Sequence, residues 1–446
     1  MSPTFKALNH PNYRLWLAGS VVSNVGTWMQ RVAQDWLVLT VLTDNSGVAV
    51  GITTGLQFAP MLLFAPFAGS VVDRFSRRRI LIGTQVGMGL LAALLGVLVV
   101  TDMAQLWMVY ALAFGLGTVA ALDGPARQTF VSELVPREDL PNAVGLNSAS
   151  FNGGRLIGPA VAGLLIHWLG GTGPVFLINA VSFAAVVIQL SRMDLDRLLL
   201  SPNASRKRGS VRDGLAYVRH RSDILLLLGI VGMIGTFTMN FQVTTALMAR
   251  LVFDKGSGQY GLLGSVMAIG SLSGALLAAR RSKPSIHLVA GAAVALGVSA
   301  LVASVMPTYW SFAVLLVPVG LSALTVMTAA NATVQLSVAP ELRGRVMALY
   351  MAIFMGGTPI GAPIIGWIGE TFGARWTIGF GGLTSLLTAA VALTLLRSGR
   401  VPDPQQVVDD VDPAAAAVPS GEVPVDLEPA LTTDAQVSPR VSSSPR

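Results

Sequence analysis

The chain has 446 residues, of which 52% are hydrophobic and 12% are charged. A soluble globular domain carries about 25% charged residues, so this composition excludes an ordinary soluble protein and indicates a chain that crosses a membrane repeatedly. The sequence contains no cysteine, which excludes disulfides and cysteine metal sites, and its four histidines show no metal-ligand spacing. We therefore expect no metal and no cofactor.

The net charge of +7 divides into two parts of opposite sign. Residues 401–446 contain eight acidic and two basic residues, which leaves 28 basic and 15 acidic residues in 1–400. Most of those basic residues fall in connections on one side of the predicted membrane, so the positive charge does not indicate nucleic-acid binding. The segment 401–446 is rich in Pro, Ala, Asp and Ser and almost free of aromatic residues, which predicts disorder.

Residues 1–13 are predicted to form a short surface segment in which Phe5, Leu8 and Tyr13 touch lipid. After it, apolar runs of about 20 residues recur, each long enough to span roughly 30 Å of hydrocarbon. Only helices satisfy their own backbone hydrogen bonds in lipid, so each run is predicted to be helical despite its glycines and prolines. The twelve predicted crossings are 14–42, 48–72, 79–100, 104–126, 142–168, 174–191, 222–250, 257–280, 285–305, 309–336, 345–369 and 375–396.

The longest connection, 192–221, carries eight basic residues and separates two sets of six crossings. Its middle is rich in turn-forming residues, and 211–219 has the pattern of an amphipathic helix in the plane of the membrane. The glycine and proline pattern of 154–163 is repeated at 357–366, in the fifth crossing of each set. The predicted fold is all-α and polytopic, with twelve transmembrane helices in two pseudo-symmetric six-helix bundles and a substrate site between them. The predicted domains are an N-terminal bundle 1–191, a cytoplasmic linker 192–221, a C-terminal bundle 222–400 and a disordered cytoplasmic tail 401–446.

The connection between the second and third crossings holds four arginines and one aspartate within 69–79. Lys and Arg concentrate in the cytoplasmic connections of membrane proteins, so this loop is predicted to lie in the cytoplasm. The same rule places 23 Lys and Arg residues inside and three outside, with both termini cytoplasmic. The loop residues predicted to latch the two bundles together are Gly69, Asp73, Arg74, Arg77 and Arg78.

Pairs of glycines four residues apart occur in crossings two, five, eight and eleven, which are equivalent positions in the two halves. Helices in lipid associate by close backbone packing, so such pairs predict contact faces. The pairs are Gly51 and Gly55, Gly154 and Gly158, Gly270 and Gly274, and Gly357 and Gly361.

Polar residues at steps of three and four form stripes on crossings one, seven and ten, with a weaker set on crossing four. A polar stripe on a membrane helix faces the bundle interior or water rather than lipid, so these stripes predict a hydrated path. The predicted lining residues are Asn24, Thr27, Gln34, Tyr110, Thr236, Asn240, Thr244, Thr325, Thr328, Asn331 and Gln335.

Three ionisable residues lie inside the predicted membrane: Arg31 and Asp35, one turn apart on crossing one, and Arg155 on crossing five. An unpaired charge at this depth costs at least about 2.5–3.5 kcal/mol, so such residues mark function or a permanent ion pair. One interpretation is that Asp35 takes up and releases a proton under the influence of the arginines. The other is that Asp35 pairs permanently with one of them and only holds the bundle together.

The motifs together resemble the major facilitator superfamily. The pattern Gly69-x-x-x-Asp73-Arg74-x-x-Arg77-Arg78 is similar to the loop signature between its second and third helices. Residues 24–30, 123–128, 155–159 and 340–347 extend the likeness, across 5–397, to the bacterial enterobactin-exporter and macrolide-efflux branch, the third drug:proton antiporter family. Gly154, Gly158, Pro159 and Gly163 are similar to the antiporter signature of crossing five. The arginine that many proton antiporters carry on crossing four is absent.

The resemblance implies a monomeric transporter of the bacterial inner membrane. It implies export of small amphipathic molecules, of the drug or siderophore class, by alternating access in exchange for protons. The partners are then a small-molecule substrate, protons and the lipid bilayer. No phosphate-binding loop and no catalytic constellation occurs in the sequence, so we expect neither ATP hydrolysis nor another enzymatic activity. An uptake symporter of a small metabolite, coupled to protons, remains the alternative, and a non-transporting sensor is a further one.

Overall fold

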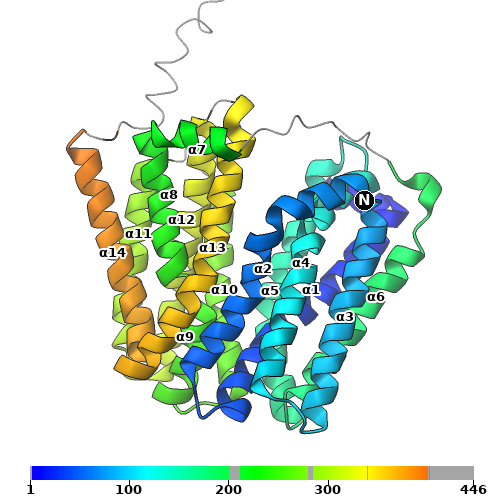
Figure 1. Cartoon of the computed structure of the whole chain (residues 1–446), viewed down its shortest axis with the longest axis horizontal. Coiled ribbons are helices and arrows are strands. Elements are labelled where there is room, and N and C mark those ends of the chain that lie inside the picture. Colours follow the sequence, from blue (N-terminus) through cyan, green and yellow to red (C-terminus); the bar gives the residue numbers. More distant parts are fainter. Residues whose placement is uncertain (1–2, 200–210, 280–284, 339, 400, 402–446) are drawn as a thin grey trace, which may run out of the picture.

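The computed structural model describes residues 3–199, 211–279, 285–338, 340–399 and 401. This described part is built of helices without a strand, and the long helices run side by side (Figure 1). The all-α prediction is therefore confirmed. The predicted disordered tail, apart from Val401, and the linker segment 200–210 lie outside the described residues.

The first half of the chain forms a group of six long helices that lie together in Figure 1. A short 3₁₀ segment (Pro3–Asn9) precedes them, and a π-helical turn (Val38–Leu42) extends the first of them. They are α1 (Pro11–Leu37), α2 (Gly47–Arg74), α3 (Arg77–Val100), α4 (Leu106–Leu134), α5 (Leu140–Trp168) and α6 (Gly173–Ser191).

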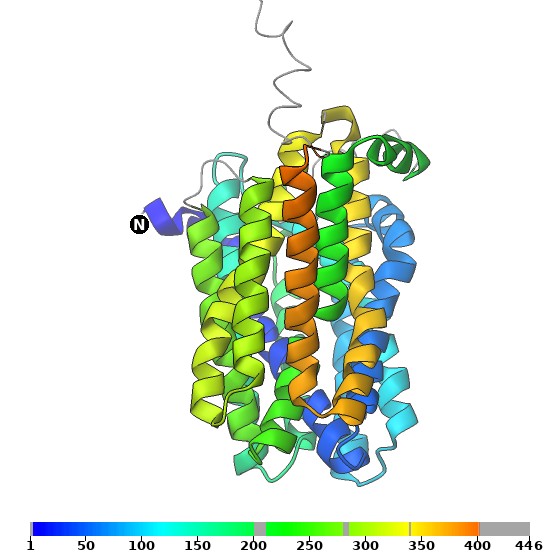
Figure 2. The ribbon, with the colours of Figure 1, turned by 90° about the vertical axis from the view of Figure 1, so that its left-hand side faces the viewer.

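The second half forms the other group of long helices (Figures 1 and 2). The short α7 (Val211–Arg219) lies across one end of this group, and its bounds confirm the predicted amphipathic helix. The remaining helices are α8 (Ser222–Phe237), α9 (Phe241–Leu247) with a π-helical turn (Met248–Val252), α10 (Ser257–Ala279), α11 (Ile286–Ser304), α12 (Tyr309–Ser337), α13 (Pro340–Phe372) and α14 (Arg375–Arg397).

Ten helical segments of the described chain are long and apolar enough to cross a membrane, with Ser222–Val252 counted as one. The helices α1 and α5, of 27 and 29 residues, run alongside them. Their polar residues lower their hydropathy, and α1 carries one of the stripes predicted to avoid lipid. The arrangement is consistent with twelve crossings.

The N-terminal segment differs from its prediction. Helix α1 begins at Pro11, and Tyr13 is fully buried instead of touching lipid. The Tyr13 hydroxyl donates a hydrogen bond of 2.8 Å to the carbonyl oxygen of Ala143 at the start of α5. A tyrosine in a core usually finds such a partner for its hydroxyl, and here the partner comes from a distant helix that sequence periodicity does not reveal. Phe5 remains exposed.

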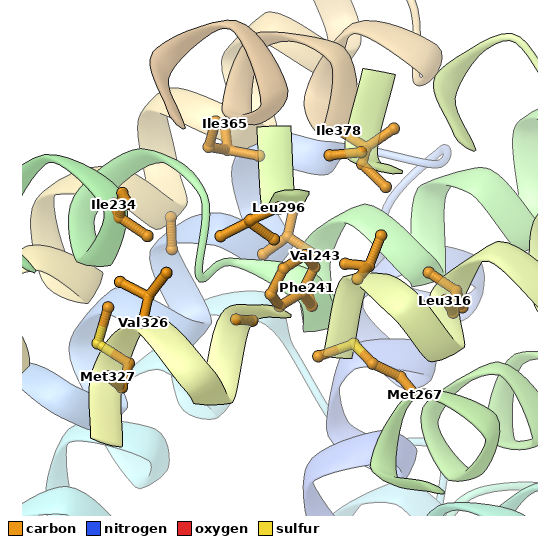
Figure 3. Packing of buried hydrophobic residues seen from close by; sticks show 14 of the residues in the cluster. Ile234, Phe241, Val243, Met267, Leu296, Leu316, Val326, Met327, Ile365 and Ile378 are labelled. Atoms are coloured by element: carbon orange, nitrogen blue, oxygen red, sulfur yellow. The ribbon is translucent and has the colours of Figure 1, made fainter. Parts of the chain in front are cut away.

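The seventh crossing is broken where the sequence predicts one continuous helix. Helix α8 ends at Phe237, and α9 begins after Asn240, whose backbone angles of φ −87° and ψ 41° are not helical. Figure 3 shows Ile234 before the break and Phe241 and Val243 after it, among buried residues of α11, α12, α13 and α14. Apolar packing therefore holds both pieces in place.

The two halves repeat the same helix contacts. Helix α5 packs on α1 at Gly154 and Gly158, and α13 packs on α8 at Gly357 and Gly361. A Cβ atom on Gly158 would lie 2.6 Å from the Cβ of Trp28. The predicted pairs on α2 and α10 also lie against other helices, α13 and α12 respectively, so all four predicted contact faces are confirmed. Backbone approach this close is open only to residues without a Cβ.

The contact between the halves, here called the seam, is formed by α2 against α13 and α5 against α10. A Cβ on Gly51 would lie 2.3 Å from the carbonyl oxygen of Ala362, and one on Gly261 would lie 2.1 Å from that of Pro159. Both contacts are backbone to backbone. The seam is thus closed by glycines at equivalent positions of the two halves, Gly51 on α2 and Gly261 on α10.

Candidate transport site

The molecule has two unlike ends. The end that carries the α2–α3 connection, with Arg74 and Arg79, is called the basic end, and the end that carries the α1–α2 connection is called the far end. At the far end, the Glu370 side chain accepts hydrogen bonds from the Ser46 hydroxyl at 2.5 Å and the Val48 amide at 3.0 Å. These groups begin α2, where unpaired amides and the helix dipole favour a carboxylate. Glu370 from α13 therefore ties the two halves together at the far end.

Asp35 lies two residues before the end of α1 and is 4% exposed. Its carboxylate accepts a hydrogen bond of 3.1 Å from the hydroxyl of Tyr260 on α10, in the other half of the chain. The ring of Trp36 stacks on the same tyrosine, with ring centres 5.7 Å apart. Asp35 thus adds a contact between α1 and α10 to the seam.

Arg31 and Arg155 meet at the ring of Trp28. The Arg31 guanidinium carbon lies 4.7 Å from the centre of that ring and 5.2 Å from the ring of Phe58 on α2. Arg155 approaches Trp28 from α5 at 5.6 Å. Cation–π contacts of this kind stabilise a guanidinium away from water. Among the described residues, no ion pair within 4.0 Å joins Asp35 to either arginine.

A hollow with a cavity volume of about 50 Å³ lies beside Arg31 in the first half. Its wall comes from five helices, α1, α2, α3, α4 and α6, and combines polar side chains with methionine and phenylalanine. The lining residues are Thr27, Gln30, Arg31, Gln57, Phe58, Met61, Met88, Leu116, Gly117, Ala120, Asn179 and Phe183. An apolar hollow with a few convergent polar groups is the usual form of a small-molecule site.

The structure brings only Thr27 and Arg31 of the predicted site residues to this hollow. Asn24 instead donates a hydrogen bond of 3.0 Å to the Ser150 hydroxyl of α5, and Gln34 is buried in α1. On α12, Thr325 and Thr328 donate to carbonyl oxygens one turn back on their own helix, and the Gln335 amide donates to Asn331 at 2.6 Å. Tyr110 and Thr236 are partly buried, and Asn240 and Thr244 are buried near the break between α8 and α9.

Within the described part of the chain, the contacts of the predicted latch residues lie inside the first half. Arg77 forms an ion pair with Glu133 near the end of α4. The Arg78 guanidinium donates 2.7 Å to the carbonyl oxygen of Leu190 at the end of α6, where unpaired carbonyls favour a cation. Asp73 and Arg74 are exposed, and a Cβ on Gly69 would meet nothing within 4 Å.

Asp123 and Arg127 form an ion pair of 3.0 Å within α4. The other oxygen of Asp123 accepts hydrogen bonds from the Thr84 hydroxyl at 2.7 Å and the Gln85 amide at 2.9 Å, both on α3. This carboxylate is therefore fully engaged in joining α3 to α4.

The sequence analysis did not identify Tyr260, Phe58 or Glu370 as site residues. A single tyrosine, phenylalanine or glutamate on a membrane helix has no spacing signal of its own, and its role depends on contact with another helix. Trp28 does have a signal, because it lies three residues before Arg31 and therefore on the same helix face.

The comparisons with known proteins agree with this architecture. The model of the transmembrane secretion effector family, within the major facilitator superfamily, matches residues 2–428. The chain belongs to this family. It is a multi-pass membrane transporter and not an enzyme.

Two relatives are efflux proteins by name. Macrolide efflux protein A of Streptococcus pyogenes is 26% identical over 362 residues, which cover 78% of this chain and 87% of that protein. Multidrug efflux pump Tap of Mycobacterium tuberculosis is 26% identical over 400 residues, which cover 85% of this chain and 92% of that protein.

Solved structures share the fold at low sequence identity. A bacterial homologue of the human lysosomal transporter Spinster, in an inward-facing and occupied conformation, has a TM-score of 0.69 at 14% identity. The match covers 85% of this chain and 96% of that one. The nucleoside transporter NupG has a TM-score of 0.68 at 12% identity, with coverage of 86% and 99%.

Proposed function

We propose that this protein exports small amphipathic molecules from the bacterial cytoplasm by alternating access, in exchange for protons. In this proposal the monomer lies in the inner membrane with its basic end and both termini in the cytoplasm, as the distribution of Lys and Arg favours. Residues 1–191 and 222–400 move as two bodies about the seam. The names of the two relatives, a macrolide efflux protein and a multidrug efflux pump, support export as the direction of transport. They also favour a drug over a siderophore as the substrate.

The observation that carries the proposal is the hydrogen bond between Asp35 and Tyr260. It places the titratable carboxyl of α1 on a contact that must break when the far end opens. An ionised carboxylate accepts a stronger hydrogen bond than a carboxylic acid does. Loss of the proton to the cytoplasm therefore strengthens the seam and holds the empty protein with its far end closed.

The cycle follows from this linkage. A proton enters from the far side while the seam is open and neutralises Asp35, and the protein then closes at the far end. Release of the proton into the cytoplasm restores the carboxylate and its bond to Tyr260. Substrate binding in the hollow supplies the free energy that reopens the seam, because a ligand shifts an equilibrium by its differential affinity for the two states. Asp73 and Arg74 are exposed in this structure. When the seam is open at the far end, these two residues close the basic end.

The test uses Asp35→Asn in everted membrane vesicles that are given a fluorescent drug on both sides of the membrane. Asparagine still accepts from Tyr260 but does not titrate. We expect dye accumulation driven by a proton gradient to fall at least about a hundredfold, the low end for the loss of a proton-transfer group. Exchange of dye without a gradient is expected to persist. The matched control is Asp254→Asn, an exposed acidic residue at the far end, which is expected to transport normally.

Two results would contradict the proposal. Normal proton-driven accumulation with normal pH dependence in Asp35→Asn would exclude the coupling role. Dye expelled from the everted vesicles by the gradient would instead support the uptake symporter.

A further inference from the structure

The guanidinium of Arg31 lies against the rings of Trp28 and Phe58, and its Nε is buried without a hydrogen-bond acceptor. No described ion pair includes it. A buried charge without hydrogen-bonded compensation is costly, so proteins keep one where a ligand or a reaction supplies the counter-charge.

The acidic groups near Arg31 are engaged elsewhere. Asp35 is one turn away on α1, and its carboxylate is bound by Tyr260 at the seam. Asp123 on α4 is paired with Arg127 and bound by α3. The second cation, Arg155, lies 5.6 Å from the centre of the Trp28 ring and adds to the positive field. The local balance of charge therefore favours an anion.

The hollow beside Arg31 has one polar wall and one apolar wall. The polar wall contains Gln30 and Asn179, whose amides are joined by a hydrogen bond of 2.5 Å. The Ser182 hydroxyl donates to Asn179 at 2.8 Å and fixes its orientation. The apolar wall contains Phe58 and Phe183, together with Met61 and Met88. Methionine adapts to irregular apolar shapes, and aromatic rings pack against flat ones.

We propose that this hollow binds an amphipathic organic anion, with its carboxylate or sulfonate on Arg31 and its aromatic or aliphatic body against Phe58 and Phe183. This inference rests on the proposed export function, because it names the substrate class of the same site. The planar fork of a guanidinium matches a carboxylate or sulfonate. The apolar wall beside the guanidinium fits the body of an organic anion and not a small inorganic ion, which would leave that wall without a partner.

The first test measures dye binding to the purified full chain in nanodiscs. The probes are fluorescein, an aromatic carboxylate, and ethidium, an aromatic cation. Arg31→Gln is expected to weaken fluorescein binding roughly ten- to a hundredfold, the effect of losing a charged hydrogen-bond partner, and not to weaken ethidium binding. Arg31→Lys is expected to restore part of the loss, since it keeps the charge without the fork. Arg219→Gln, on the exposed surface of α7, is the matched control and is expected to change neither.

A second test leaves Arg31 intact and so avoids a variant that fails to fold. The chain has no cysteine, so Ala120→Cys places a single thiol in the wall of the hollow. Its reaction with an anionic methanethiosulfonate sulfonate is expected to be about tenfold faster than with the trimethylammonium reagent, as in a cleft of one charge sign. Fluorescein is expected to slow both reactions.

The outcomes separate this inference from the proposed function. Equal reaction rates for the two reagents, or fluorescein binding unchanged in Arg31→Gln, would overturn the anion site even if vesicles export ethidium. Charge-selective labelling with fluorescein protection would support the anion site, even if a failure of all vesicle transport removed the export function.

Discussion

The two ends of the seam are built differently. Toward the far end, Gly51, Gly261 and Gly366 are in backbone contact with the opposite half, and an added Cβ would lie 2.1–2.3 Å from a carbonyl oxygen. Toward the basic end, an added Cβ on Gly69 or Gly145 would meet nothing within 4 Å. The same seam helices thus carry glycines in contact at one end and glycines in open space at the other. The difference shows that glycine contacts close the seam toward the far end, whereas Gly69 and Gly145 make no such contact toward the basic end.

The largest expected effect comes from breaking the closed end. In Gly51→Leu the side chain meets the backbone of α13 at Ala362, which cannot move away as a flexible side chain could. Overpacking of this kind costs about 1–3 kcal/mol. We expect dye efflux to fall at least about tenfold and the far end to become accessible to aqueous cysteine reagents.

Gly145→Leu is the matched control at the open end of α5. Its added side chain enters open space, so we expect efflux within about twofold of the wild type and an unchanged free energy of unfolding. If both variants lost dye efflux equally, the difference in glycine packing between the two ends would not affect transport.

A smaller effect is expected at Glu370, whose side chain joins the two halves through hydrogen bonds at the far end. Glu370→Gln keeps an acceptor for Ser46 and Val48 but removes the negative charge from the start of α2. A charge at an exposed helix terminus contributes about 0.3–1 kcal/mol. We expect the free-energy difference that favours the closed far end to fall by that amount. The populations of closed and open far ends are measured as energy transfer between single dye pairs across the seam. An unchanged population would show that the charge of Glu370 does not stabilise the closed far end.

The smallest effect is expected at the basic end, where the N-terminal segment binds α5 within the first half. The Asp139 carboxylate binds Lys6 at 2.8 Å and accepts from His10 at 2.9 Å. In Asp139→Asn we expect a cysteine at the buried position Ala7 to react several times faster with an aqueous reagent, with transport unchanged. Slow labelling in this variant would show that other contacts hold the segment.

The pH dependence of that contact has a definite sign. The hydrogen bond from His10, followed by that from Lys6, lowers the pKa of Asp139 from its ordinary value of 3.8. A lowered pKa means that the contact stabilises the folded state fully above the ordinary value and is lost as the pH falls through the lowered one. Labelling at residue 7 of the wild-type background, divided by the rate for the same cysteine in the unfolded chain at the same pH, is therefore expected to stay low at neutral pH and to rise below about pH 4.

The sequence predicted the helices, the repeat and the glycine contact faces because apolar length and small-residue spacing are local signals. It placed Asp35 and Arg31 on one helix face for the same reason. It did not predict Tyr260 as the partner of Asp35, because that contact joins residues 225 positions apart. It also missed the break after Phe237, which contains neither glycine nor proline and depends on packing from four other helices.

The central claim is that the far end and the basic end open in alternation. Spin labels on cysteines at Asp44 and Thr371 report the far end, and labels at Arg79 and Arg219 report the basic end; all four positions are exposed. Distances are measured by pulsed electron resonance in proteoliposomes, at rest and during dye transport with a proton gradient. We expect the Arg79–Arg219 distance to shorten in the population in which the Asp44–Thr371 distance lengthens. Two distances that stay constant, or that change in the same direction, while dye is transported would contradict the account.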